Sequence, residues 1–340
     1  MRRVAVVDVG STSAHVDVVE LRRKRPPRQS VTVKHKVSLS REVGPDGRIR
    51  EESMARLVRA VGRAADTAAR HGADEMVAFA TSVVRDAPNR DAVLARVAEA
   101  SGVRLGFLTP RQEAGLTYEG ARAWRRPGSE EPLLVADIGG GTFELALGTG
   151  PRTRNLVSAP LGARRLTLAA LPGDPPSPRD VARLRRRLAR EMPALLDSLG
   201  RVPDGTAFLG ASRVFAQLAA ATADEAACLA ASGGATTPGE HGAAPGVDPV
   251  LDLRRLRAAL PELAAMTWQE RAERPGVSRA RAPHILAGAL LAEALMDAAR
   301  IGELPVCPWG LREGIALRLR ADLRGGTNSA GAVERLRQPA

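Results

Sequence analysis

The sequence of 340 residues contains little cysteine and few aromatic side chains. Its two cysteines, Cys228 and Cys307, are far apart and lack metal-site spacing, so we predict neither a disulfide framework nor a zinc site. Aromatic residues make up 3% of the chain, which is too few for the stacking platforms that bind single-stranded nucleic acid. Sparse cysteine suits a reducing compartment, and we therefore expect a cytoplasmic protein.

The chain also lacks a long hydrophobic run. The apolar run Val4–Val7 stops at Asp8, before it could serve as the core of a signal peptide. The stretch Ile285–Met296 is too short to cross a bilayer and contains Glu293. The sequence thus predicts no membrane segment.

Lysine is scarce, whereas arginine is abundant. Lysine occurs only at Lys24, Lys34 and Lys36, yet the formal net charge is +12 and the pI is about 11.1. Because arginine is spread over the whole chain, this charge indicates a composition bias as much as a nucleic-acid surface, and we expect no nucleic-acid partner. The charge is compatible with a small polyanion. With 44% hydrophobic and 26% charged residues, the chain has the composition of a globular protein, and its length favours two domains.

The hydrophobic pattern predicts an α/β protein. In the first 125 residues we expect strands at 4–9, 14–21, 31–39, 76–80 and 103–108, and helices at 54–70, 90–100 and 112–123. In the rest we expect strands at 133–137, 143–147, 155–158, 207–209 and 304–307, helices at 179–199, 214–221, 253–263, 284–299 and 309–323, and a surface loop at 232–247. Three strands followed by alternating helices and strands are typical of a mixed sheet flanked by helices.

One pattern occurs twice along the chain. A strand ending at Asp8 leads into Gly10-Ser11-Thr12-Ser13, and a strand ending at Asp137 leads into Gly139-Gly140-Gly141-Thr142. The offset of 129 positions between the two aspartates indicates an internal duplication. Backbone N–H groups and hydroxyls in such turns can hold phosphate, although an ordinary hairpin turn would use the same residue types. The carboxylates of Asp8, Asp137 and Glu144 would repel phosphate unless a hard cation such as Mg²⁺ lay between them.

Six motifs give the chain a resemblance to a known family. They are Asp8-Val9-Gly10-Ser11, the segment Ala80–Asn89 (ATSVVRDAPN), Gln112–Tyr118 (QEAGLTY), Asp137–Glu144 (DIGGGTFE), Leu161–Leu166 (LGARRL) and Pro308–Gly314 (PWGLREG). In this order, over nearly the whole chain, they resemble the exopolyphosphatase/guanosine pentaphosphate phosphohydrolase family in its short two-domain form.

The resemblance implies two ribonuclease-H-like domains, as in actin, sugar kinases and acetate kinase, with an active-site cleft between them. We expect the first domain at 1–125, the second at 126–305, a C-terminal helix at 306–324 that packs back on the first domain, and a flexible tail at 325–340. The resemblance also implies Mg²⁺, a homodimer, and release of orthophosphate from inorganic polyphosphate, with shorter chains as the expected substrate, or from guanosine pentaphosphate.

Individual residues take roles from the same resemblance. Glu113 matches the catalytic base that activates water, although a glutamate in the first turn of a helix is also favoured by the helix dipole alone. Arg85 matches a phosphate-binding arginine, and its alternative is an ion pair with Asp86. Asp137 and Glu144, joined by Asp8, match the metal-associated acids. For Arg312 and Glu313 the favoured interpretation is a structural ion pair.

Two departures from the family pattern leave other functions open. Thr12 stands where the family usually has asparagine, and Thr142 stands where it usually has serine. Threonine cannot supply the two amide donors of asparagine, so a sensor that binds polyphosphate or guanosine pentaphosphate without hydrolysis is one alternative. A nucleotide-dependent kinase of the same fold is another, although no adenosine-binding signature is found. The sequence does not separate the two substrates or fix the chain length, the oligomeric state or a monovalent-ion requirement.

Overall fold

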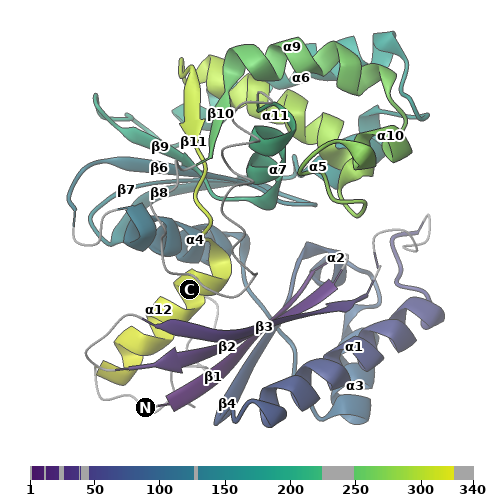
Figure 1. Cartoon of the computed structure of the whole chain (residues 1–340), viewed down its shortest axis with the longest axis vertical. Helices are drawn as coiled ribbons and strands as arrows, with labels where there is room; N and C mark the ends of the chain where they lie inside the picture. Colours follow the sequence, from purple (N-terminus) through teal and green to yellow (C-terminus); the bar gives the residue numbers. More distant parts are fainter. Residues whose placement is uncertain are drawn as a thin grey trace. The chain divides into compact units, whose positions relative to one another are not determined.

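A computed structural model of the chain describes residues 2–10, 13–22, 27–37, 39, 46–125, 129–223 and 249–324 (Figure 1). These residues divide into two compact units. The first unit holds the described residues up to Glu113 and from Arg312 onward, and the second holds those from Ala114 to Leu311. The chain passes between the units inside helix α4 (Pro110–Arg125) and at the start of helix α12 (Leu311–Arg324).

The first unit contains a five-stranded sheet in the order β3-β2-β1-β4-β5. The strands are β1 (Arg2–Val9), β2 (Ser13–Leu21), β3 (Arg28–Lys36), β4 (Glu75–Ala80) and β5 (Gly106–Phe107). Strands β1, β2 and β3 form an antiparallel meander, whereas β4 runs parallel to β1 and β5 runs parallel to β4. This is the mixed sheet that the order of predicted elements indicates.

Helices cover both faces of this sheet (Figure 1). Alternate residues of β1 and β2, including Val7 and Val16, pack in one core with helices α1 (Glu51–Arg70) and α3 (Arg90–Ser101). Side chains of opposite parity, such as Asp17, lie on the other face, where α12 packs. A short helix, α2 (Ser82–Arg85), follows β4.

The second unit repeats this topology in a four-stranded sheet with the order β8-β7-β6-β9. Its strands are β6 (Leu133–Ile138), β7 (Phe143–Thr149), β8 (Arg152–Ala159) and β9 (Ala207–Gly210). Strand β6 is antiparallel to β7 and parallel to β9, as β1 is to β2 and β4. The register repeats as well, since Asp8 pairs with His15 and Asp137 with Glu144 at the same offset of 129 residues. The duplication inferred from two short segments is therefore present in the fold.

Two layers of helices enclose the second sheet. Helix α4 covers one face through Tyr118 and Ala121, which pack on Leu133 and Val135. The intervening residues of β6 face a larger core that is built mainly from helices. These helices are α5 (Ala163–Ala170), α6 (Pro178–Asp197), α7 (Arg213–Ala221), α9 (Leu253–Ala265), α10 (Trp268–Glu273) and α11 (Ile285–Ala298), beside the short strands β10 (Val250–Asp252) and β11 (Glu303–Pro305).

The structure corrects several predicted elements. Strand β3 begins three residues earlier than predicted, because the alternation of exposed and half-buried side chains includes Arg28 and Gln29. Strand β5 is two residues long instead of six. The sequence does not predict helices α2, α5 and α10 or strand β10, because short elements give little periodicity. The predicted loop at 232–247 and the tail at 325–340 lie outside the described residues. In the part of the chain that the structure describes, no helix has the length and hydrophobicity needed to span a bilayer.

Candidate active site

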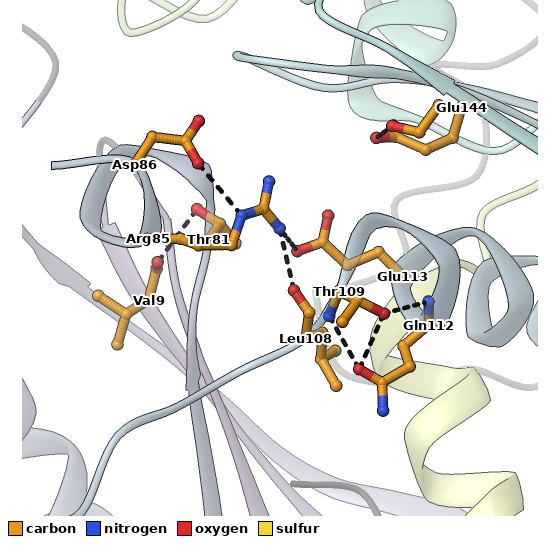
Figure 2. Close-up of polar contacts among 10 residues, drawn as sticks. Val9, Thr81, Arg85, Asp86, Leu108, Thr109, Gln112, Glu113 and Glu144 are labelled. Carbon is orange, nitrogen blue, oxygen red and sulfur yellow. Dashed lines mark hydrogen bonds and ion pairs between the residues drawn. The ribbon is translucent and has the colours of Figure 1, made fainter. Parts of the chain in front are cut away.

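The first of the two predicted phosphate turns joins β1 to β2. The Gly10 N–H donates to the Ser13 carbonyl at 2.9 Å, so this amide closes the hairpin and does not point outward. The carbonyl of Val9 accepts from both the N–H and the hydroxyl of Thr81, at 3.0 and 3.3 Å (Figure 2). Ser11 and Thr12, predicted to bind phosphate, lie outside the described residues.

The second turn, Gly139–Thr142, is fixed by the start of α5. Gly139 closes the turn by donating to the Thr142 carbonyl at 2.9 Å. The carbonyls of Gly139, Gly140 and Gly141 accept from the amides of Ala163, Arg165 and Gly162 at 2.9, 3.1 and 3.2 Å. The Arg165 side chain adds a bond from Nε to the Gly141 carbonyl at 3.0 Å.

These bonds decide where the amides of the turn point. In a trans peptide the carbonyl and the following N–H point in opposite directions. Because three successive carbonyls are held toward α5, the N–H groups of Gly140, Gly141 and Thr142 face the opposite side. Successive amides turned to one side form an anion-binding nest. The sequence predicts no role for the motif around Gly162, and the structure shows that this segment orients the turn.

Asp137 and Glu144 lie directly opposite each other on β6 and β7. Directly opposed residues share a face of the sheet, and these two continue the series of positions that face α4. Glu144 is buried, and its Oε1 accepts from the Ser158 hydroxyl at 3.1 Å. The structure thus brings these two predicted metal-associated acids together.

The two carboxylates fit Mg²⁺ as partial ligands. No group of three metal-ligating side chains occurs among the described residues. Mg²⁺ does not need one, because it keeps several waters and is usually bound through one or two carboxylates plus substrate phosphates. The oxygen donors of Asp137 and Glu144, with Ser158 orienting one of them, match this preference. The third predicted acid, Asp8, belongs to the first unit, where its role as a metal ligand stays a prediction.

Arg85 and Glu113 form an ion pair in the first unit (Figure 2). The Arg85 Nη1 donates to Glu113 Oε1 and to the Leu108 carbonyl, both at 3.0 Å. Its Nε contacts Asp86 at 3.3 Å, which is the ion pair considered as the alternative for this arginine. The side chains of Arg85 and Glu113 are 14% and 15% exposed, so this pair is largely but not fully shielded from water.

The N-terminus of α4 fixes the position of Glu113. Thr109 and Gln112 form a reciprocal cap, in which the Thr109 amide donates to Gln112 Oε1 at 2.8 Å and the Gln112 amide donates to Thr109 Oγ1 at 3.2 Å (Figure 2). Pro110 occupies the first helical position, where its missing N–H is not needed. The Glu113 amide closes the first turn on the Thr109 carbonyl at 2.9 Å. These hydrogen bonds therefore fix the backbone that carries the Glu113 side chain.

Arg312 takes part in an ion pair, as expected, but its partner is Asp17 of β2. Asp17 is buried, and its other oxygen accepts from the Thr32 hydroxyl at 2.8 Å. Burial alone would lower the pKa of Arg312, but attraction by Asp17, Glu313 and Asp8 outweighs burial and raises this pKa above its usual value. Asp8 therefore lies within the electrostatic field of Arg312.

A family model described as the Ppx/GppA phosphatase family matches residues 27–322. The chain belongs to this family. Exopolyphosphatase 1 of Mycobacterium leprae is 38% identical over 316 residues, which cover 93% of this chain and 89% of that protein. Exopolyphosphatase 2 of Mycobacterium tuberculosis is 31% identical over 337 residues, covering 94% and 99%.

Solved structures of Ppx/GppA relatives share the fold. An exopolyphosphatase from Cytophaga hutchinsonii has a TM-score of 0.79 at 22% identity, with 96% of this chain and 99% of that chain covered. The Aquifex aeolicus member of the Ppx/GppA family has a TM-score of 0.74 at 23% identity, covering 96% and 99%. The predicted two-domain α/β fold and the predicted family are therefore confirmed.

Proposed function

We propose that this member of the Ppx/GppA phosphatase family is an exopolyphosphatase that releases orthophosphate from the end of short inorganic polyphosphate. The observation that supports it best is the contact between Glu113, the proposed general base, and Arg85, the proposed phosphate-binding cation. The names of the relatives, exopolyphosphatase 1 and exopolyphosphatase 2, point to the same substrate.

Glu113 acts as the general base. Its carboxylate lies against Arg85, and an ionised carboxylate can take a proton from water. The water oxygen then forms a bond to the terminal phosphorus, and the bond from that phosphorus to the bridging oxygen breaks. The shortened chain leaves with the electron pair, and orthophosphate is the other product.

Arg85 binds the terminal phosphate. Among the described residues no hydrogen bond uses its Nη2, while Nη1 and Nε hold the guanidinium in place. The two N–H groups of Nη2 remain for phosphate oxygens, and a fixed fork of this kind suits phosphate better than a flexible ammonium.

The second unit contributes a separate phosphate cradle. The amides of Gly140, Gly141 and Thr142, turned to one side by α5, donate to phosphate oxygens. Asp137 and Glu144 would hold Mg²⁺, which would supply positive charge to the phosphates. Thr142 keeps one hydroxyl donor at the edge of this cradle.

Orthophosphate release tests this function directly. We would compare the wild type and Glu113→Gln on short polyphosphate, long polyphosphate, guanosine pentaphosphate and ATP with Mg²⁺, with Glu119→Gln on the same helix as the control. We expect release to fall by about 10²- to 10⁴-fold in Glu113→Gln and to stay near wild type in the control.

The ranking of substrates separates the alternatives. Faster release from guanosine pentaphosphate than from either polyphosphate would assign that substrate instead. Tight polyphosphate binding without release by the wild type would identify a sensor, the function that Thr12 and Thr142 leave open. Sedimentation equilibrium would test the homodimer.

A further inference from the structure

A groove in the first unit lies apart from the residues assigned above. It has a volume of about 460 Å³ between the edge strand β3 and helix α1, and it is lined by His35, Arg63, Asp66, Ala69 and Arg70. His35 points from β3 toward α1, because Val31, which has the same parity on β3, packs against the core that contains this helix. The volume is in the range of small-ligand sites.

Two arginines give this groove its charge. Arg63 and Arg70 are seven residues apart on α1, which is two turns or about 10 Å along one face of the helix. Among the described residues, no carboxylate lies within ion-pair distance of either guanidinium. Arg70 is held in place by contacts at 3.4 Å with the Asp66 carbonyl and the Thr67 hydroxyl.

His35 is oriented by a buried hydroxyl. The Thr67 hydroxyl donates its single proton to the Arg63 carbonyl at 2.8 Å. Because that proton is used, the contact of 3.3 Å between His35 Nε2 and Thr67 Oγ1 requires Nε2 to carry the hydrogen. The nitrogen that gains or loses a proton is therefore Nδ1.

We propose that this groove binds a small anion of the phosphate class between Arg63 and Arg70. Two guanidiniums offer a dianion several charge-assisted hydrogen bonds. Among the described residues that line the groove, Asp66 is the acidic one, and its carboxylate can accept the P–OH hydrogen of a singly protonated phosphate. This arrangement favours phosphate over sulfate, which carries no such hydrogen near neutral pH.

Binding is coupled to protonation of His35. Burial lowers the pKa of this imidazole, and the positive charges of Arg63 and Arg70 lower it further. An anion between the arginines offsets both charges, so it raises the pKa of His35. By linkage the anion binds more tightly as the pH falls through that range. Of the other charged groups on the two elements, Asp66 of α1 lines the groove, whereas Lys34 and Lys36 flank His35 on β3 with the opposite parity.

Histidine NMR on the full-length protein tests the proposal at the site itself. The His35 resonance is assigned by its loss in His35→Gln, and its titration is followed in chloride, sulfate and orthophosphate at equal ionic strength. We expect orthophosphate to raise the pKa of His35 and sulfate to raise it less. A phosphate monoester such as glycerol phosphate shows whether the site takes free orthophosphate or a phosphorylated molecule.

Substitutions then identify the groups that bind. Arg63→Gln and Arg70→Gln should each weaken orthophosphate binding at His35 by about tenfold, the value of one charge-assisted hydrogen bond. Arg96→Gln, an exposed arginine on α3, should leave it unchanged. If the pKa of His35 in the wild type were equal in chloride and in orthophosphate, that result alone would overturn the proposal. Equal shifts in sulfate and phosphate would overturn the assignment to phosphate. Neither result depends on catalysis, so the proposed function is tested separately.

Discussion

Arg312, the second residue of α12, pairs with the buried carboxylate of Asp17 on β2, 295 residues earlier in the chain. Replacing the arginine leaves that carboxylate with the Thr32 hydroxyl and no cation. We expect Arg312→Met to lower the free energy of unfolding by about 3 kcal/mol, because breaking a buried pair leaves the other charge buried without a partner. Urea unfolding measures this value. Arg318→Met on the exposed side of the same helix is the control and should change it by less than about 0.5 kcal/mol.

Arg85 should be needed for its shape as well as its charge. Arg85→Gln removes the charge beside Glu113, and we expect kcat/KM for polyphosphate to fall by about 10²-fold. Arg85→Lys keeps the charge but loses the fork, so it should recover only part of the activity. Steady-state kinetics with Arg90→Gln, an exposed arginine nearby, checks that the effect is local. Full recovery in Arg85→Lys would contradict a phosphate-binding fork.

Gly162 should tolerate no side chain. A Cβ at this position would overlap the backbone of Gly140 and Gly141. We expect Gly162→Ala to lower stability by about 1–3 kcal/mol through overpacking and to reduce polyphosphate hydrolysis by displacing the turn. Gly115→Ala has open space around its Cβ inside α4 and should instead add about 0.5–1 kcal/mol. Thermal unfolding and phosphate release of both variants test this contrast.

Ser158 should affect the requirement for Mg²⁺. Its hydroxyl is a hydrogen-bond donor to Glu144, so Ser158→Ala removes a group that orients a proposed metal ligand. We expect the Mg²⁺ concentration for half-maximal phosphate release to rise about tenfold, with little change in stability. Ser198→Ala, whose hydroxyl bonds the end of α6, is the control. An unchanged Mg²⁺ dependence in Ser158→Ala would argue against metal binding at Glu144.

The lowered pKa of His35 should make the free energy of unfolding depend on pH. Its pKa in the folded chain lies below the ordinary value of 6.5, so the unfolded chain binds more protons between the two values. The stability that neutral His35 contributes is therefore fully present above pH 6.5 and is lost as the pH falls toward the pKa of His35 in the folded chain. We expect the wild type to lose more stability than His35→Gln between about pH 7.5 and 5.5. Urea unfolding in chloride buffers, which avoid added phosphate, measures the difference.

Much of the fold could be predicted from the sequence, because its strands are continuous apolar runs bounded by glycine and its long helices have a clear period. The pairing of Asp137 with Glu144 also follows from sequence, since a tight turn joins their strands. The metal and catalytic roles, the domain bounds and the cytoplasmic location stay predictions.

Other contacts depend on tertiary packing and leave no local signal. The backbone hydrogen bonds between the Gly162 segment and the glycine turn are not encoded by any side-chain pattern. The contact of Arg85 with Glu113 joins residues 28 positions apart, and Asp86 next in sequence is the obvious partner to expect. Asp17 gives no sign that its partner is Arg312, because nearly the whole chain separates them.

The return of α12 to the first unit has a consequence for synthesis on the ribosome. One face of the β1–β5 sheet carries Val4, Val6 and Asp17, all buried in the finished fold. The second unit, by contrast, is complete in sequence at Leu311. The nascent chain can therefore complete its second unit before its first. The β1–β5 sheet, although synthesised earlier, keeps one face uncovered until α12 has emerged from the ribosome.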